Sequence, residues 1–302
     1  MNRSLLANLA VAVTMGVPAV ATADLKVVTT TSDLAAIVEA IGGEHVDVTA
    51  MALPTQDPHF VDARPHLALA LSRADLLVAI GLGLEVGWLP TLQTGSRNGE
   101  IQSGGRGFLD ASRHVRPLEV PAGRVDRSQG DIHPGGSPHF MFDPRRVAEV
   151  ARAIGARMAQ LDGSNADAYR AGTERFVTAL ERARARWERQ LAGLRGANVI
   201  AYHKSFGYLA DWLGFRVVEH IEPRPGIPPN PHHVAHVLGA ARQHGVRVIL
   251  QESFYPETTS DLIAQRTSAR LVRIPGGPDV RRGESYVDFM DGVVRMLVGA
   301  AR

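Results

Sequence analysis

The chain has no cysteine among its 302 residues. This absence excludes a disulfide framework, a thiolate metal site and a lipid-bearing cysteine at a cleavage point. Charge of neither sign dominates, because 33 Lys and Arg residues stand against 31 Asp and Glu residues and no basic cluster occurs. Such a balance argues against nucleic acid as a partner. Beyond residue 23 no apolar run reaches the roughly 18 residues of a membrane-spanning helix, so we expect a mature chain that is not embedded in a membrane.

The N-terminal segment has a different composition. Arg3 is followed by an apolar stretch at residues 5–20, and the segment ends in Ala21-Thr22-Ala23. A positive start, an apolar centre and small residues at the end are typical of a signal peptide. We therefore expect export to the periplasm with removal of residues 1–23, so that the mature chain starts near Asp24.

A long helix is expected over residues 162–194. The segment contains no proline, and charged residues separate its apolar positions. These positions recur every three or four residues, as on one stripe of a helix: Phe176, Leu180, Ala183, Trp187, Leu191 and Leu194. The helical part measures about 45 Å at 1.5 Å per residue. Two interpretations fit this length, a spine that joins two domains and a long surface helix of one domain.

Strand and helix patterns alternate on both sides of this helix. Before it we expect strands at 25–30, 46–52 and 76–80 and helices at 34–41, 65–73 and 144–161. After it we expect strands at 198–202, 216–220, 246–251 and 271–274 and helices at 205–213, 231–243, 256–267 and 285–297. Residues 95–136 read mostly as loop. The alternation predicts the α/β class, with βα lobes of parallel sheet at residues 24–161 and 195–302.

Three histidines lie in loops at the expected cleft between the lobes, where open α/β sheets bind ligands. His59 follows the second strand, His139 precedes the helix at 144–161, and His203 directly follows a strand. Imidazole nitrogen suits a borderline cation such as zinc, and a carboxylate would complete a tetrahedron. Taken singly, each residue is more often a surface or hydrogen-bonded histidine than a metal ligand. Spacing alone therefore leaves both interpretations open.

Several short motifs resemble those of a known family over nearly the whole mature length. In order they are Asp57-Pro58-His59, Gly83-Leu84-Glu85, PHFMFDP at 138–144, NADAY at 165–169, Tyr202-His203 and VILQE at 248–252. The chain resembles the metal-specific substrate-binding proteins of ABC importers (cluster A-I), the group that contains ZnuA, TroA and PsaA. The resemblance implies a rigid helix that joins two βα lobes, with one metal ion in the cleft. It also implies that His59, His139 and His203 are ligands of that ion.

The resemblance further implies zinc. Manganese binders of the family tend to place a carboxylate, a harder oxygen ligand, at the third ligand position, whereas this chain has His203 there. The long histidine-rich insertion of the ZnuA type is absent, and the closer likeness is to the zinc-binding AztC type, which has a flexible loop before the second histidine. In this chain that loop is residues 124–136. We expect it to be mobile without metal and to become partly ordered when zinc binds.

The fourth ligand implied by the resemblance is Asp279, an aspartate after the last strand of the second lobe. Glu252 is its rival, with a hydrogen-bond acceptor for a histidine ligand as its other interpretation. His133, in the loop, is considered as a transient zinc contact against an incidental histidine. His232 and His236 have a spacing that can bind zinc on a helix, but they fall largely off the buried stripe and are interpreted as a solvated face.

These expectations combine into one function, that of an exported solute-binding protein. It captures one zinc ion per chain and delivers it to the permease of an ABC importer, with a zinc metallochaperone as a further candidate partner. We do not expect an enzyme, because a closed four-ligand site favours binding and a catalytic zinc keeps one position open for water. The alternatives are a manganese-binding protein of the same family and a secreted zinc hydrolase. The hydrolase is disfavoured because no His-Glu-x-x-His motif occurs.

Overall fold

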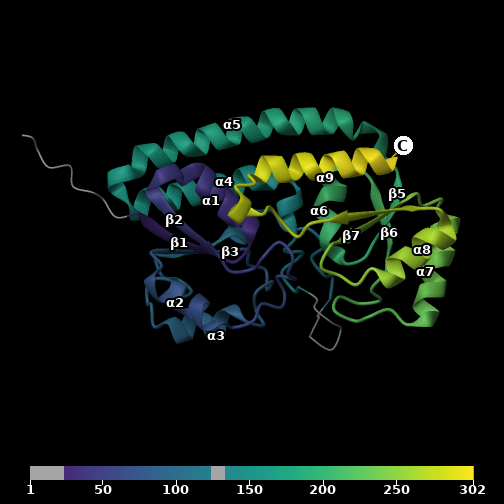
Figure 1. Cartoon of the computed structure of the whole chain (residues 1–302), viewed down its shortest axis with the longest axis horizontal. Coiled ribbons are helices and arrows are strands. Elements are labelled where there is room, and N and C mark those ends of the chain that lie inside the picture. Colours follow the sequence, from purple (N-terminus) through teal and green to yellow (C-terminus); the bar gives the residue numbers. More distant parts are fainter. Residues whose placement is uncertain (1–23, 124–132, 302) are drawn as a thin grey trace, which may run out of the picture.

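A computed structural model describes residues 24–123 and 133–301 (Figure 1). The expected signal peptide and residues 124–132 of the loop lie outside the described residues. Within those described ranges, no helix is both long enough and apolar enough to cross a membrane.

The N-terminal lobe is built on a four-stranded sheet of parallel strands in the order β2-β1-β3-β4. The third strand in the chain is buried along its whole length, which accounts for its uninterrupted apolar sequence LLVA. The elements of this lobe are β1 (Leu25–Thr29), α1 (Ser32–Gly42), β2 (Val46–Ala50), α2 (Pro65–Arg73), β3 (Leu76–Ala79), α3 (Leu89–Ser96), β4 (Phe108–Asp110) and α4 (Pro144–Leu161).

The C-terminal lobe repeats this architecture with a parallel sheet in the order β6-β5-β7-β8. Its central strand β7 is also buried at every position. The elements are β5 (Asn198–Ala201), α6 (Gly207–Leu213), β6 (Arg216–His220), α7 (Pro231–Gln243), β7 (Val248–Glu252), α8 (Thr258–Thr267), β8 (Arg270–Ile274) and α9 (Tyr286–Ala301). The expected α/β class with two parallel sheets is thus confirmed.

One long helix, α5 (Ala166–Gln190), runs along both lobes (Figure 1). It is shorter than the expected 162–194, because 3-10 turns at Gly163–Asn165 and Ala192–Leu194 flank it. All six apolar residues of the expected stripe are buried. The helix packs on α1 and α4 of the first lobe and on α9 of the second. These contacts favour the spine interpretation over a surface helix of one domain.

A shared core explains how the spine holds both lobes. One cluster of buried apolar side chains extends from α1 through α5 to α9 and includes Ile37, Trp187 and Val293. Two smaller clusters fill the opposite faces of the sheets, under α2 and α3 and under α7 and α8. At Gly172 the spine approaches α1 closely, and a Cβ atom there would lie 2.0 Å from the Ile41 carbonyl oxygen. Only glycine allows that approach.

Residues 95–136 hold more structure than the sequence indicated. The end of α3, strand β4 and a 3-10 turn at Ala111–His114 lie in this region. Strand β4 has only three residues, too few for an alternating pattern to be recognised. The other expected strands and helices are present, with ends shifted by a few residues.

Candidate metal centre

Three histidines from both lobes meet in the cleft. His59 lies in the loop after β2, His139 precedes the 3-10 turn that leads into α4, and His203 lies two residues after β5. One ring nitrogen from each lies within 4.8 Å of the other two. Each of the three ring pairs has its centroids 5.2 Å apart. The fold therefore brings together the three histidines that the sequence singled out.

Carboxylates orient two of these imidazole rings. The Nδ1 atom of His59 is 2.7 Å from Asp57 Oδ1, and the Nδ1 atom of His203 is 2.7 Å from Glu222 Oε2. A neutral imidazole that donates its Nδ1–H to a carboxylate presents an Nε2 lone pair, as in carboxylate–histidine–metal arrangements. Glu222 is buried together with His203. This pair is thereby shielded from water.

Neither carboxylate was expected from the sequence to have a role at the site. Asp57 lies two residues before His59, and its Oδ1 also accepts the His59 backbone N–H at 2.9 Å. That short spacing is a usable signal, since aspartate commonly accepts a hydrogen bond from a backbone N–H two residues on. Glu222 lies 19 residues from its partner. No sequence pattern connects residues at that separation, so only the fold reveals the pair.

Burial keeps two of the three histidines, His139 and His203, uncharged. The pKa values of His139 and His203 are held well below 6.5, first by loss of hydration and then by repulsion among the neighbouring histidines. The Nε2 atom of His139 is buried and has no hydrogen-bond partner within the described residues. A neutral imidazole with an unpaired nitrogen is ready to bind a cation.

A fourth histidine borders the group. His133 Nε2 lies 3.3 Å from His59 Nε2, and the two rings are stacked with centroids 5.4 Å apart. Its Nδ1 lies 3.1 Å from the Leu82 carbonyl oxygen. Donation of the Nδ1–H to that oxygen leaves Nε2 as the free acceptor. Burial, followed by repulsion from His59, lowers the pKa of His133 to about 4.

The two expected carboxylate candidates do not join this group. In the described part of the chain, only His59, His139 and His203 bring at least three donors so close together. Asp279 begins the 3-10 turn Val280–Arg282, and its carboxylate lies 3.3 Å from Arg282 and 3.7 Å from Arg281. Both arginine side chains are largely exposed, so these ion pairs are weak, and the Oδ1 atom of Asp279 is buried without a hydrogen-bond partner among the described residues. Asp279 thus lies outside the close group of three histidine donors in this structure, and its role as the fourth ligand stays a prediction.

Glu252 lies closer to the cluster. It is buried at the end of β7, and together with His59, His139 and Asp33 it lines a cavity of about 50 Å³ between the lobes. Its Oε2 atom has no hydrogen-bond partner among the described residues. Burial raises its pKa to about 7. A buried carboxyl group of this kind is partly protonated at neutral pH.

The remaining histidines of interest lie elsewhere. His232 and His236 are exposed on α7, and His236 Nε2 is 2.8 Å from Glu219 Oε2 at the surface of the second lobe. They form no close group of three donors within the described ranges. Their expected place on a solvated face agrees with this exposure.

A two-lobed α/β chain with neutral imidazoles facing one another across the cleft defines a metal-binding protein of the substrate-binding class. The model of the family described as "Zinc-uptake complex component A periplasmic" (ZnuA) matches residues 27–300. The chain belongs to this family. Its members are periplasmic metal-binding components of ABC transporters and are not enzymes, so the alternative of a secreted hydrolase is not supported.

Curated relatives cover most of the chain at low identity. The chain is 22% identical over 274 residues to "High-affinity zinc uptake system protein ZnuA" of Bacillus subtilis (strain 168), covering 88% of this chain and 84% of that protein. It is 23% identical over 276 residues to "Manganese-binding lipoprotein MntA" of Halalkalibacterium halodurans, covering 88% and 85%. Names of both metals occur at similar identity, so these relatives do not distinguish zinc from manganese.

Solved structures share the fold. The structure titled "Crystal structure of ZnuA" matches with a TM-score of 0.76 and 23% identity, over 92% of this chain and all of that one. The manganese-bound periplasmic metal-binding protein of Candidatus Liberibacter asiaticus matches with a TM-score of 0.72 and 19% identity, over 91% of this chain and 99% of that one. At these identities the match establishes the two-lobed fold and leaves the metal open.

Proposed function

We propose that this protein captures one zinc ion in the periplasm and delivers it to the permease of an ABC importer. The observation that carries the proposal is the triangle formed by His59, His139 and His203, with equal ring separations and two rings oriented by carboxylates. Two of these residues come from the first lobe and one from the second. An ion bound by all three would therefore hold the two lobes together.

The donor set favours zinc over manganese. Imidazole nitrogen suits zinc, whereas manganese prefers carboxylate, carbonyl and water oxygens. Asp57 and Glu222 use their oxygens to accept hydrogen bonds from the rings, so they strengthen the nitrogen donors without offering oxygen to the ion. A site of this kind discriminates by ligand type.

Two residues compete for the fourth position in this proposal. Zinc–nitrogen bonds of about 2.0–2.1 Å place neighbouring ligand nitrogens of a tetrahedron roughly 3.4 Å apart. The 3.3 Å between the Nε2 atoms of His133 and His59 fits that edge. Asp279 is the family-based candidate and would have to leave Arg281 and Arg282. His133 also lies outside the close group of three donors, but its distance to His59 makes it a candidate for an equilibrium ligand as well as for a transient contact.

Glu252 has a different role in this scheme. With Oε2 unpaired and a pKa near 7, it can lose its proton when a cation enters beside it. Its charge would then compensate the ion from within the cavity, without direct coordination. Glu252→Gln tests this, since the variant keeps the shape and removes the charge.

Zinc analysis of the mature protein, followed by competition with a chromophoric chelator, tests the proposal. We expect one zinc per chain and zinc displacing manganese. Alanine at His59, His139 or His203 should abolish tight binding, whereas His236→Ala, on the exposed face, should bind like the parent. Zero or several zinc ions per chain, or manganese displacing zinc, would contradict the proposal.

The same titrations rank the fourth-ligand candidates. If His133 is the fourth ligand, His133→Ala should weaken zinc binding more than Asp279→Ala does. Cobalt substitution adds a spectroscopic check, because visible absorption reports the coordination number and the nitrogen or oxygen character of the ligands. A larger loss for Asp279→Ala would return the fourth position to the aspartate and leave the three-histidine proposal intact.

Delivery to a permease is the second half of the proposal. Family membership supports an ABC transporter as the partner, and the N-terminal sequence pattern supports export. A zinc metallochaperone that loads the site would be a further partner. Zinc-dependent stimulation of the ATPase of the cognate transporter by the loaded protein, and none by His203→Ala, would be the expected result.

A further inference from the structure

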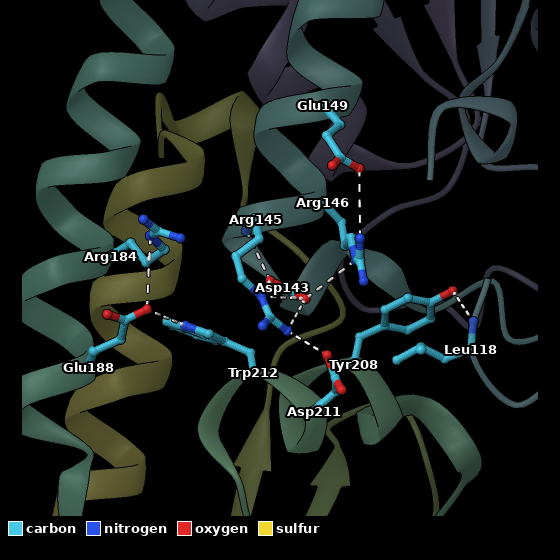
Figure 2. A network of polar contacts seen from close by, with 10 residues as sticks. All are labelled: Leu118, Asp143, Arg145, Arg146, Glu149, Arg184, Glu188, Tyr208, Asp211 and Trp212. Carbon is cyan, nitrogen blue, oxygen red and sulfur yellow. Dashed lines mark hydrogen bonds and ion pairs between the residues drawn. The ribbon is translucent and has the colours of Figure 1, made fainter. Parts of the chain in front are cut away.

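A buried tyrosine joins the two segments that carry His139 and His203. Tyr208 belongs to α6 of the second lobe, five residues after His203, and it is fully buried. Its hydroxyl accepts the Leu118 backbone N–H at 3.0 Å and donates to the Ser137 carbonyl oxygen at 3.1 Å. Figure 2 shows the ring reaching from α6 toward Leu118. One hydroxyl thus contacts the first lobe at two points.

These two points belong to one small hydrogen-bonded unit. The Ser137 backbone N–H donates to the Leu118 carbonyl oxygen at 2.9 Å. The His139 backbone N–H in turn lies 3.4 Å from Ser137 Oγ. Gly136 permits the close approach, because a Cβ atom there would lie 2.8 Å from the Leu118 carbonyl oxygen. The position of His139 therefore depends on a unit that the Tyr208 hydroxyl closes.

A second contact ties the same helix to the first lobe but is more exposed. Arg145, at the start of α4, bonds Asp143 at 2.8 Å and Asp211 of α6 at 2.6 Å (Figure 2). The Arg145 and Asp211 side chains are 35% and 46% exposed, and exposed ion pairs contribute little. The buried Tyr208 contact is the one that acts directly on the segment before His139.

We propose that Tyr208 is a positioning residue for metal binding: its hydroxyl fixes the Ser137–His139 segment of one lobe against the His203 segment of the other. The proposal rests on the proposed function, since the positioned group is a proposed metal ligand. Without the hydroxyl, the Leu118 N–H and Ser137 C=O groups lose a shared partner in a buried place and must move to find another. The His139 ring then loses its fixed distance to His203.

Tyr208→Phe is the test, because it removes one oxygen and keeps the ring that packs edge-to-face on Phe140 with centroids 6.1 Å apart. Loss of a group hydrogen-bonded to a metal ligand typically costs about 10–100-fold in affinity; because Tyr208 acts through the backbone next to His139, we expect a loss at the lower end of that range for zinc. Cobalt bound to the variant should show an altered visible spectrum. A merely structural hydroxyl would not change the spectrum.

Tyr169→Phe is the matched control. Tyr169 is equally buried, and its hydroxyl donates to Asp162 Oδ2 at 2.7 Å and lies 3.1 Å from a second acceptor, the His45 carbonyl oxygen. His45 precedes β2 and so lies at the sheet edge opposite the histidine cluster. We expect wild-type zinc affinity and an unchanged cobalt spectrum for this variant. Equal losses in the two variants would overturn the proposal.

A metal-free measurement separates this inference from the zinc function. Amide hydrogen exchange in the apo protein should be faster at Leu118 and over residues 137–142 in Tyr208→Phe, and unchanged there in Tyr169→Phe. Unchanged exchange, or unchanged zinc affinity in a variant of a zinc-binding parent, would overturn the positioning role alone. A parent that binds no zinc but shows the exchange difference would overturn the zinc function and support the tyrosine contact.

Discussion

Replacement of Glu222 by alanine should weaken zinc binding without touching a proposed ligand. The His203 and Glu222 side chains are 3% and 6% exposed, and His203 Nδ1 lies 2.7 Å from Glu222 Oε2. A hydrogen bond to a charged group contributes about 1.5–3 kcal/mol, which corresponds to roughly 10–150-fold in an equilibrium constant. Removing an outer partner of a metal-binding histidine costs about 10–100-fold. Both estimates predict that the zinc affinity of Glu222→Ala falls by about 30-fold, or about 2 kcal/mol of binding free energy.

The physical reason is the choice of tautomer. In Glu222→Ala the His203 ring can place its proton on either nitrogen, and the form with Nε2–H cannot bind the ion. Glu222→Gln keeps an acceptor oxygen without the charge, so its loss should be smaller. Chelator competition at neutral pH measures all three proteins under the same conditions.

Glu219→Ala is the matched control for this prediction. Glu219 makes a similar contact, 2.8 Å to His236, but with a histidine side chain that is 60% exposed and outside the cluster. Zinc affinity should be unchanged in this variant. Zinc binding by Glu222→Ala within about threefold of the parent, well under the 10–100-fold expected of an orienting partner, would contradict this role of Glu222. An equal loss in Glu219→Ala would contradict it too.

Two further predictions concern stability. Zinc at about 1,000 times its Kd should stabilise the folded protein by roughly 4 kcal/mol, seen as a higher melting temperature by calorimetry; an equal shift in His203→Ala would show that the metal acts elsewhere. Burial raises the pKa of Asp33 from 3.8 to about 7, so the folded state binds more protons than the unfolded state between these values and loses stability as pH rises through them. Asn does not titrate, so Asp33→Asn should lack this loss. The free energy of unfolding of the apo variant, relative to that of the parent, should therefore be higher at pH 8 than at pH 5 by about 2–4 kcal/mol. Denaturant unfolding at both pH values measures this difference, and an equal effect at pH 5 and pH 8 would contradict it.

The fold was largely predictable because its signals are local. An apolar stripe defined α5, and short apolar runs defined most strands, since both patterns depend on residues close in sequence. Strand β4 and helix α3 were not expected. Strand β4 has only three residues, too few to show an alternating pattern. Helix α3 has a proline at its second position, which is equally typical of a turn.

The candidate site was predictable in its histidines but not in the groups around them. His59, His139 and His203 were singled out because each lies in a loop at the expected cleft, and the family resemblance then made them predicted ligands. Glu222 acts across the second lobe, and Tyr208 acts between the lobes. Such pairs depend on how loops distant in sequence pack together, and no local sequence pattern predicts that packing. His133 and Asp279 show the same limit, since their distances from the cluster are set by loop conformation.

The metal preference of the site depends on the ligand atoms and on the charge of the carboxylates that accept hydrogen bonds from the histidines. The substitution His203→Asp tests both. The substitution places an oxygen ligand in the cluster, which favours manganese over zinc. It also places a carboxylate near Glu222, which now accepts from His203 at 2.7 Å, and two buried carboxylates repel unless one is protonated. The single variant should therefore bind every metal poorly.

The double variant His203→Asp with Glu222→Gln removes the repulsion and should bind manganese better than the single variant does, while zinc affinity stays below that of the parent. Competition between the two metals on all three proteins measures this order. If the single variant already binds manganese as well as the double variant does, Glu222 contributes no charge to the site, and its role is limited to holding the ring.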